Sequence, residues 1–260
     1  MMMDEIKLIF LTDMHLVSKN SFLGINTFDS FSSVVDDVIQ NHSNADFVIF
    51  GGDLVQDQSK DSYAFFKSQI NRIKALKLFA RGNHDVCDIF FNSLKKDTST
   101  FFSKNDWRIF NLETYSKGNI FGEVKKDDLN RLKLEANKRK DKFFFIFMHH
   151  NLFLTHSPWL DIHITKERTS ILDQIIDIDN IKLVVNGHVH QETRNIYNGL
   201  NFISAPSTSI QFTSGQKSFK LARLQPGYLV IKLKKNGTWD VSCQRVEGEF
   251  GSPEINPSAY

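Results

Sequence analysis

The sequence predicts a single α/β domain whose core contains one or two mixed β-sheets. Short apolar runs of strand length alternate with stretches of helical periodicity along most of the chain. Near the C-terminal end, two pairs of strand-like runs are joined by Asn-Gly, a dipeptide typical of tight hairpin turns. The 260 residues contain no internal repeat and no low-complexity linker that would divide them into separate units.

The expected strands before the hairpins are short and apolar, and they cover Lys7–Leu11, Phe47–Phe50, Lys77–Ala80, Ile109–Leu112, Phe143–Met148 and Lys182–Val185. The expected helices between them cover Phe28–Gln40, Ser62–Ile73, Lys125–Lys140 and Glu167–Ile176. The hairpins pair Thr193–Tyr197 with Leu200–Ile203, and Leu229–Leu233 with Trp239–Cys243. We expect the domain to span residues 1–247. Residues 248–260 lose all periodicity, so a flexible tail is expected there.

Composition limits the classes of protein that this chain can be. There are 32 basic and 30 acidic residues, too small an excess to neutralise phosphates over a broad face, so we expect no nucleic-acid partner. Cys87 and Cys243 form no disulfide framework and fit a reducing compartment. No apolar stretch approaches the roughly 20 residues of a membrane helix, and the N-terminus lacks a basic signal-peptide start. We expect a cytoplasmic protein without a membrane partner, either a monomer or a homodimer.

Polar residues directly follow five of the predicted strands. The five motifs are Asp13-Met14-His15, Gly51-Gly52-Asp53, Gly82-Asn83-His84-Asp85, His149-His150 and Gly187-His188-Val189-His190. Each alone has an ordinary explanation, such as a helix-capping aspartate or a glycine turn. Ligand sites in open α/β sheets, however, gather beyond the carboxyl ends of the strands. Together the motifs hold six of the nine histidines, which favours one shared site.

The side chains in these motifs suit two metal ions. They offer carboxylate, amide and imidazole groups without a thiolate, which fits manganese, iron or zinc. As ligands, Asp13 and Asp53 would contribute two negative charges, whereas Asn83 and the histidines would be neutral. Two divalent ions would leave a net charge of about +2, which attracts a phosphate ester and lowers the pKa of bound water.

The same residues resemble the metal-ligand signature of the calcineurin-like metallophosphoesterases, namely Asp-x-His, Gly-Asp, Gly-Asn-His-Asp/Glu, His and Gly-His-x-His. Further stretches are similar to the bacterial class III cyclic-AMP phosphodiesterases. These stretches are Trp159-Leu160-Asp161-x-His163, Gly187 to Glu192, Ala205 to Phe212 and Pro226-Gly227-Tyr228. The match is collinear from about Lys7 to Val246. The resemblance implies a four-layer α/β sandwich in which two mixed β-sheets are flanked by helices.

The resemblance also implies a set of ligands for the two metal ions, for which iron, manganese or both are expected and zinc is the alternative. One ion would be bound by Asp13, His15 and His190, the other by Asn83, His149 and His188, and Asp53 would bridge them. His149 is expected rather than His150, because the ligand in the family is the earlier histidine after the strand. The family often has His-His-Pro there, and this chain has Asn151 instead of the proline, which leaves substrate preference more open than metal binding.

The resemblance further implies that His84 is the catalytic histidine, that Asp85 is its orienting partner, and that Asn83, His84 and His149 contact the substrate. The implied reaction is hydrolysis of 3′,5′-cyclic AMP, or a related cyclic nucleotide, to the 5′-monophosphate. A hydroxide held between the metals would attack phosphorus in line. His84 would give a hydrogen bond or a proton to the leaving 3′-oxygen.

Three alternatives remain open. One is a broader phosphodiesterase that acts on glycerophosphodiesters or 2′,3′-cyclic nucleotides. The second is a protein phosphatase, suggested by Arg81 before Gly82, although Gly52 to Asp57 lacks the Gly-Asp-x-Val-Asp-Arg-Gly loop of that family. The third is a metal-free scaffold. Two sets of polar or aromatic residues could either face the substrate or only pack. They are Trp159, Asp161 and His163, and Ser207, Thr208 and Gln211.

Overall fold

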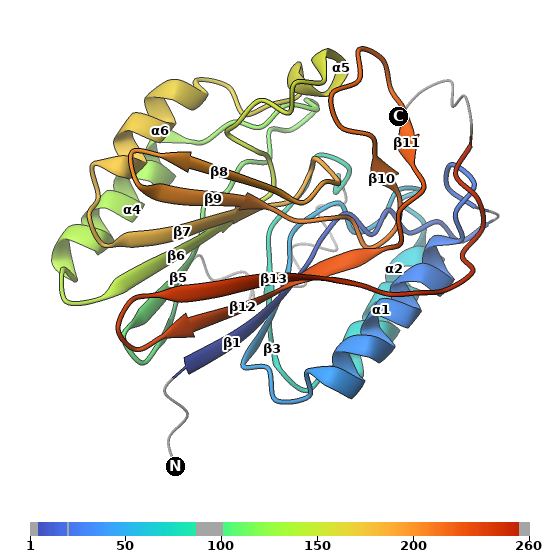
Figure 1. Ribbon diagram of the computed structural model, residues 1–260, viewed down its shortest axis with the longest axis horizontal. Helices are drawn as coiled ribbons and strands as arrows, with labels where there is room; N and C mark the ends of the chain where they lie inside the picture. Colours follow the sequence, from blue (N-terminus) through green and yellow to red (C-terminus); the bar gives the residue numbers. More distant parts are fainter. Residues whose placement is uncertain (1–4, 20, 87–100, 255–260) are drawn as a thin grey trace.

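Two β-sheets lie face to face, and helices cover the outer face of each, in the computed structural model of the chain (Figure 1). The structure describes residues 5–19, 21–86 and 101–254. This arrangement of helix, sheet, sheet and helix is the predicted four-layer sandwich. The predicted fold class is therefore confirmed.

Both sheets are mixed. The first contains β1 (Glu5–Leu11), β2 (Phe47–Phe50), β3 (Leu76–Phe79), β12 (Gly227–Lys234) and β13 (Trp239–Arg245) in the order β13-β12-β1-β2-β3. The second contains β4 (Phe101–Lys104), β5 (Trp107–Asn111), β6 (Phe143–Met148), β7 (Ile181–Asn186), β8 (Thr193–Tyr197) and β9 (Leu200–Ser204) in the order β4-β5-β6-β7-β9-β8. Strands β1, β2 and β3 run parallel, as do β5, β6, β7 and β9, so their carboxyl ends share one edge of each sheet.

The helices bury one apolar face each. Helices α1 (Thr27–Asn41) and α2 (Lys60–Asn71) pack on the first sheet, and α4 (Lys126–Lys138) and α6 (Arg168–Ile176) on the second (Figure 1). Side chains cap the first two helices, because Asn26 accepts from the backbone of Asp29 and Ser59 from that of Ser62. A single turn, α5 (Pro158–Asp161), and a two-strand pair, β10 (Gln211–Phe212) with β11 (Leu221–Ala222), complete the described elements.

The strand Phe143–Met148 shows how the core is shared between the layers. Because side chains alternate across a strand, Phe145 and Phe147 point toward the first sheet, whereas Phe144 and Ile146 point toward α4 and α6. All four side chains are at most 1% exposed. A strand buried on both faces reads as a continuous apolar run, which is what the sequence shows here.

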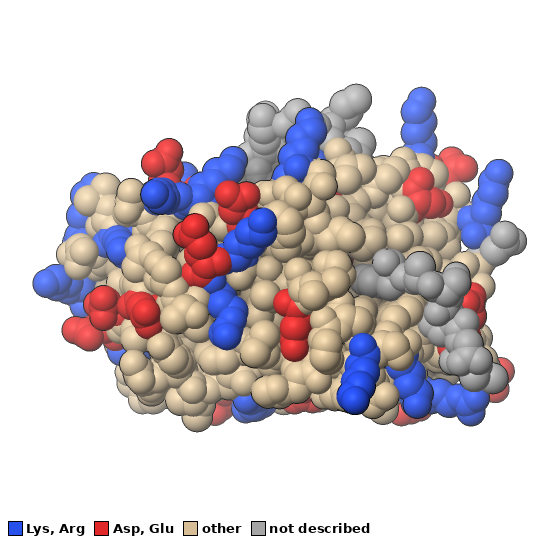
Figure 2. Space-filling view, turned by 90° about the horizontal axis from the view of Figure 1, so that it is seen from above, with Lys and Arg blue, Asp and Glu red and all other residues tan. Residues whose placement is uncertain are grey.

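The predicted elements lie within a few residues of the observed ones, but β4, α5 and the short pair β10 and β11 are not predicted. Strand β4 is not predicted, since its sequence Phe-Phe-Ser-Lys has no clear alternation and it pairs only with β5. Helix α5 is a single turn, too short for a periodic signal. No helix in the described ranges is long and apolar enough to cross a membrane. On the face seen in Figure 2, acidic and basic side chains are interspersed rather than gathered into one patch.

The expectation of a flexible tail is wrong for residues 248–254, which we call the C-terminal strap. Asn26 donates its backbone N–H to the carbonyl of Phe250 at 2.7 Å, and Glu254 donates to the carbonyl of Leu23 at 3.1 Å. The Phe250 side chain is 8% exposed and belongs to a buried apolar cluster. The strap docks through backbone groups and one aromatic ring, so it needs no periodic pattern. Residues 255–260 lie outside the described residues.

Replacing Phe250 with Ala is expected to lower the free energy of unfolding by about 3 kcal/mol, because a buried phenylalanine is lost from a packed cluster. Urea denaturation at a fixed metal concentration measures the change. Glu249→Ala, an exposed position in the same strap, is the matched control and should change stability by less than about 0.5 kcal/mol. Equal stability of the two variants would show that the strap is not docked in solution.

Candidate metal centre

The loops that carry the five motifs meet at one end of the two sheets. Asp13 donates its backbone N–H to the carbonyl of Gly52 at 3.0 Å, which joins the loops after β1 and β2. His188, after β7 in the second sheet, donates its N–H to the Asp13 carboxylate at 3.0 Å. The His149 ring, after β6, contacts the carbonyl of Gly51 at 2.7 Å. The predicted convergence of the strand-end motifs is therefore what the fold produces.

Five of the converging residues have a left-handed backbone, with φ values from 44° to 67°. They are Asp13, His15, Asp53, His188 and His190. Residues other than glycine rarely adopt this conformation, which costs roughly 1–3 kcal/mol each and is concentrated at functional sites. It redirects the chain within one residue, so that short loops can aim several side chains at one place.

The first group of possible ligands is Asp13, His15 and His190. The Nε2 atoms of the two histidines are 3.1 Å apart, and His190 Nε2 is 3.5 Å from Asp13 Oδ1. The Nδ1 atoms point away from this centre, that of His15 to Gln56 Oε1 and that of His190 to the carbonyl of Ile210, both at 2.8 Å. An Nδ1–H donated to an oxygen leaves the Nε2 lone pair free for a metal ion.

The second group is Asn83, His149 and His188. His149 Nε2 lies 3.3 Å from Asn83 Oδ1. His188 is 1% exposed, and both of its ring nitrogens are buried without a hydrogen-bond partner. Buried polar atoms are normally paired, so an orphaned imidazole in a cluster of histidines is what a metal-ligand position would show. The residues present therefore fit a bound metal ion.

Asp53 lies between the two groups. Its Oδ2 atom is 3.2 Å from His149 Nε2 and 3.7 Å from His15 Nε2. Its Oδ1 atom accepts the backbone N–H of His84 at 2.8 Å. Ligand atoms of Asp13, His15 and His190, and also those of Asp13, Asp53 and His149, lie within 4.8 Å of one another. The clustered groups suggest two metal ions.

The electrostatics of the cluster favour the metal-binding protonation states of four groups, namely Asp13, Asp53, His15 and His188, but they favour a protonated His149. Burial opposes ionisation of Asp13 and Asp53, but the neighbouring imidazoles outweigh it and hold the pKa of both carboxyls below the usual range. Burial lowers the pKa of His15 to about 3 and that of His188 well below its usual value. Burial would also lower the pKa of His149, but the Asp53 carboxylate raises it to about 10. A cation at the centre would displace the proton that His149 holds there.

His150 differs from His149 in its contacts. Its Nδ1 lies 2.9 Å from Thr114 Oγ1 and its Nε2 lies 3.0 Å from the carbonyl of Ile120, so both ring nitrogens are engaged. A His150 nitrogen also lies within 4.8 Å of those of His149 and His188. Burial and the neighbouring His149 lower the pKa of His150 to about 3. Its contacts are those of a structural histidine beside the centre.

His84 and Asp85 occupy different surroundings. His84 is half-buried, and its ring meets that of His15 edge-on at a centroid distance of 5.0 Å. Asp85 is fully buried and accepts three backbone N–H groups, from Asp53 at 2.7 Å and from Gly82 and Leu54 at 2.9 Å. Burial and the Asp53 charge raise its pKa to about 7. Asp85 thus holds two loops together through the backbone, and the expectation that it orients the His84 ring stays a prediction.

Two glycines in the motifs are required by close approaches. Gly52 has a φ of 101°, and a Cβ there would lie 2.5 Å from His149 Nδ1. A Cβ on Gly82 would lie 2.1 Å from Asp53 Oδ1. Any side chain at either position would push a candidate ligand out of place.

The segment from Pro206 to Phe212 packs against the loop that carries Asp13 and holds its backbone by hydrogen bonds. The hydroxyls of Ser207 and Ser209 donate to the carbonyl of Asp13 at 2.7 and 3.1 Å, and Gln211 donates to the carbonyl of Ser207 at 2.7 Å. Thr208 donates its N–H to the carbonyl of Thr12 at 3.0 Å. All are buried, so the packing interpretation describes these side chains better than the substrate-facing one. The contact of Ser209 is not predictable, because nothing in the sequence separates this residue from its neighbours.

The loop from Trp159 to His163 has mixed roles. Asp161 accepts the N–H and hydroxyl of Thr155 at 2.7 and 2.8 Å, which fixes the loop. The Trp159 ring packs edge-on against Phe212, which in turn stacks on His190 at 4.0 Å. The rings of Trp159 and Phe212 thus pack behind the candidate ligand His190, and no pattern in the sequence predicts this packing. His163 is half-buried, and burial and the nearby His84 lower its pKa. A substrate-facing role for His163 stays a prediction.

The family model for calcineurin-like phosphoesterases matches residues 6–192, a range that contains all five motifs. The chain belongs to this family. The resemblance expected from the strand-end motifs is therefore confirmed.

Two cyclic-AMP phosphodiesterases are similar to this chain over nearly its full length. The 3′,5′-cyclic adenosine monophosphate phosphodiesterase CpdA of Haemophilus influenzae is 29% identical over 98% of this chain and 95% of its own length. CpdA of Escherichia coli is 25% identical over the same shares of the two chains. A dimetal phosphatase from Danio rerio is similar in fold, with a TM-score of 0.66, 11% identity and coverage of 93% of this chain and 99% of that one.

Proposed function

We propose that this phosphoesterase is a metal-dependent phosphodiesterase that hydrolyses 3′,5′-cyclic AMP, or a closely related cyclic nucleotide, to the 5′-monophosphate. The observation that carries the proposal is the Asp53 carboxylate between two groups of buried ligands. Similarity to the CpdA proteins along nearly the whole chain supports the choice of a cyclic nucleotide as substrate.

Two metal ions would share the centre in this proposal. The ligands are Asp13, His15 and His190 for the first ion, Asn83, His149 and His188 for the second, and Asp53 for both. The contacts of His149 with Asp53 and Asn83 favour it over His150, whose nitrogens have other partners. Oxygen and imidazole donors favour iron, manganese or both, with zinc as the alternative.

When bound, the two ions would activate a water molecule and neutralise charge on the phosphoryl oxygens. The residues of the chain supply the rest of the mechanism. Asn83 can turn its amide toward a phosphoryl oxygen while its Oδ1 remains near the His149 ring. The hydrogen bond from His84 N to Asp53 fixes the backbone of His84, and its half-buried ring stays accessible to a substrate. From there His84 donates a proton to the leaving 3′-oxygen.

A comparison of substrates tests the proposal. The protein is loaded with manganese or iron and assayed on 3′,5′-cyclic AMP, 2′,3′-cyclic AMP, a bis-aryl phosphodiester and an aryl phosphomonoester. We expect kcat/KM for 3′,5′-cyclic AMP to exceed that for 2′,3′-cyclic AMP by about tenfold or more. Chelation should abolish turnover, and added metal should restore it.

Each other outcome has a defined meaning. Similar kcat/KM values for all diesters would favour the broader phosphodiesterase. Activity confined to the monoester would rule out a diesterase. Purified protein that neither contains nor acquires metal would support the scaffold alternative.

A further inference from the structure

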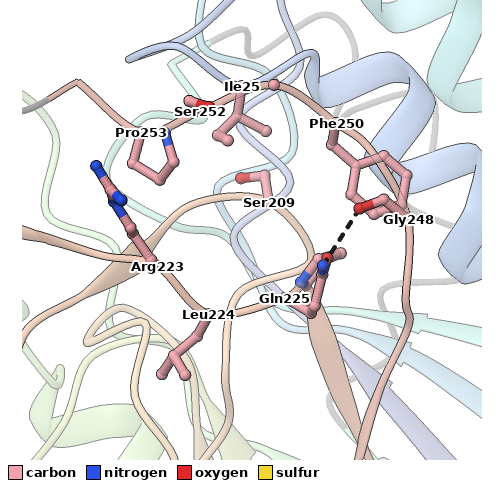
Figure 3. Close-up of a pocket in the computed structure, with 11 residues that line it drawn as sticks. Ile25, Ser209, Arg223, Leu224, Gln225, Gly248, Phe250, Ser252 and Pro253 are labelled. Atoms are coloured by element: carbon pink, nitrogen blue, oxygen red, sulfur yellow. Dashed lines mark hydrogen bonds between the residues drawn. The ribbon is translucent and has the colours of Figure 1, made fainter.

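A surface pocket of about 240 Å³ lies between the C-terminal strap and the segment from Arg223 to Pro226 (Figure 3). Ile25, Phe250 and Pro253 form apolar walls, and Ser209, Arg223 and Gln225 contribute polar groups. Gln225 donates its side-chain amide to the carbonyl of Gly248 at 3.2 Å, the hydrogen bond drawn in Figure 3, which closes the pocket on the side of the strap. The pocket is therefore lined by both polar and apolar groups.

Arg223 supplies the charge of this pocket. Its side chain is exposed, and within the described ranges its guanidinium has neither an ion-pair nor a hydrogen-bond partner. Figure 3 shows it extending toward Pro253 along the edge of the pocket. An unpaired guanidinium presents a fork of N–H donors that matches a carboxylate or a phosphate.

The pocket shares its supports with the first group of candidate ligands. Ser209 lines the pocket, and its hydroxyl donates to the carbonyl of Asp13 at 3.1 Å. Ile25 and Phe250 belong to the same apolar cluster as Phe212, whose ring stacks on His190. A ligand that orders these walls would also order the residues that hold Asp13 and His190 in place.

We propose that this pocket binds a small organic anion, with its carboxylate or phosphate on Arg223 and an apolar body against Ile25, Phe250 and Pro253. The volume lies just below the range of about 300–1,000 Å³ that drug-sized ligands occupy, so the ligand is smaller than these. Occupancy slows the loss of metal from Asp13, His15 and His190. This second statement rests on the metal ligands assigned under the proposed function.

Calorimetric titration of the metal-loaded protein with phenylacetate and with phenylphosphonate tests binding and distinguishes the two anions. We expect saturable binding of at least one of them, with phenylacetamide, the neutral analogue, at least about tenfold weaker. Arg223→Ala should weaken the anion by about tenfold or more, whereas Arg131→Ala, on the exposed face of α4, should leave it unchanged. Failure of both anions to bind, or binding that is insensitive to Arg223→Ala, would overturn the proposal.

The rate at which a chelator removes metal tests the second statement. The bound anion should slow this rate at least threefold in the wild-type protein and have no effect on Arg223→Ala. Binding at Arg223 without any change in metal loss would contradict the link to the metal centre. Neither measurement uses a substrate, so a negative result here is separate from a failure of the proposed phosphodiesterase activity.

Discussion

Replacing Asp53 with Asn is expected to remove most of the bound metal and to lower turnover of cyclic AMP by about 10³-fold or more. Asp53 is fully buried, and its Oδ2 atom lies within 4 Å of a histidine from each ligand group. An amide has the same shape but half the acceptors and no charge, so at least one ion would lose a ligand and the site would gain a unit of positive charge.

Elemental analysis of the purified variant and kcat on cyclic AMP measure these two effects. Asp240→Asn is the control, because Asp240 is exposed and pairs with Lys234 on the surface. The control should keep wild-type metal content and turnover. If the Asp53→Asn variant retained two equivalents of metal, Asp53 would not be a ligand that bridges the two ions.

Replacing His84 with Ala is expected to leave the metal content unchanged and to lower kcat on cyclic AMP by about 10²-fold or more. The ring of His84 lies at the edge of the cluster beside His15, and its half-exposed position suits contact with a leaving group. A ring nitrogen of His84 also lies within 4.8 Å of ligand atoms of His15 and Asp53. Metal analysis therefore decides whether His84 is an acid or a ligand.

The leaving group provides a second readout for His84. An aryl diester releases a phenolate that needs little protonation, so His84→Ala should reduce its turnover much less than that of cyclic AMP. His156→Ala, an exposed histidine on a neighbouring loop, should affect neither substrate. Equal losses on both diesters would mean that His84 does not protonate the leaving oxygen.

The strand-end motifs are predictable because a parallel sheet places the carboxyl ends of its strands together. The order of strands and polar residues along the chain therefore assigns Asp13 and Asp53 to one edge of the first sheet, whereas His188 follows a strand of the second sheet and reaches them because the two sheets pack face to face. In the folded protein these three residues are joined through backbone and side-chain hydrogen bonds between their loops. Burial of the strand Phe143–Met148 on both faces is equally predictable, since the run is continuously apolar and an apolar layer covers each face.

The supports of the site cannot be predicted in the same way. From the sequence, Ser207 and Gln211 could either face the substrate or only pack, and in the fold they donate to the carbonyls of Asp13 and Ser207. Only the three-dimensional course of the chain after β9 decides which way they face. The docking of the C-terminal strap is equally unpredictable. It depends on backbone hydrogen bonds such as that of Asn26 to Phe250, and these produce no recognisable pattern of side chains in the sequence.

A left-handed backbone at five residues limits how the sequence of this protein could evolve. These residues are Asp13, His15, Asp53, His188 and His190. At roughly 1–3 kcal/mol each, five such residues together oppose folding by an amount comparable to the typical net stability of a whole domain. Glycine would relieve that strain at every one of them. Selection for thermal resistance alone would therefore favour loss of these side chains, and only selection for activity keeps them.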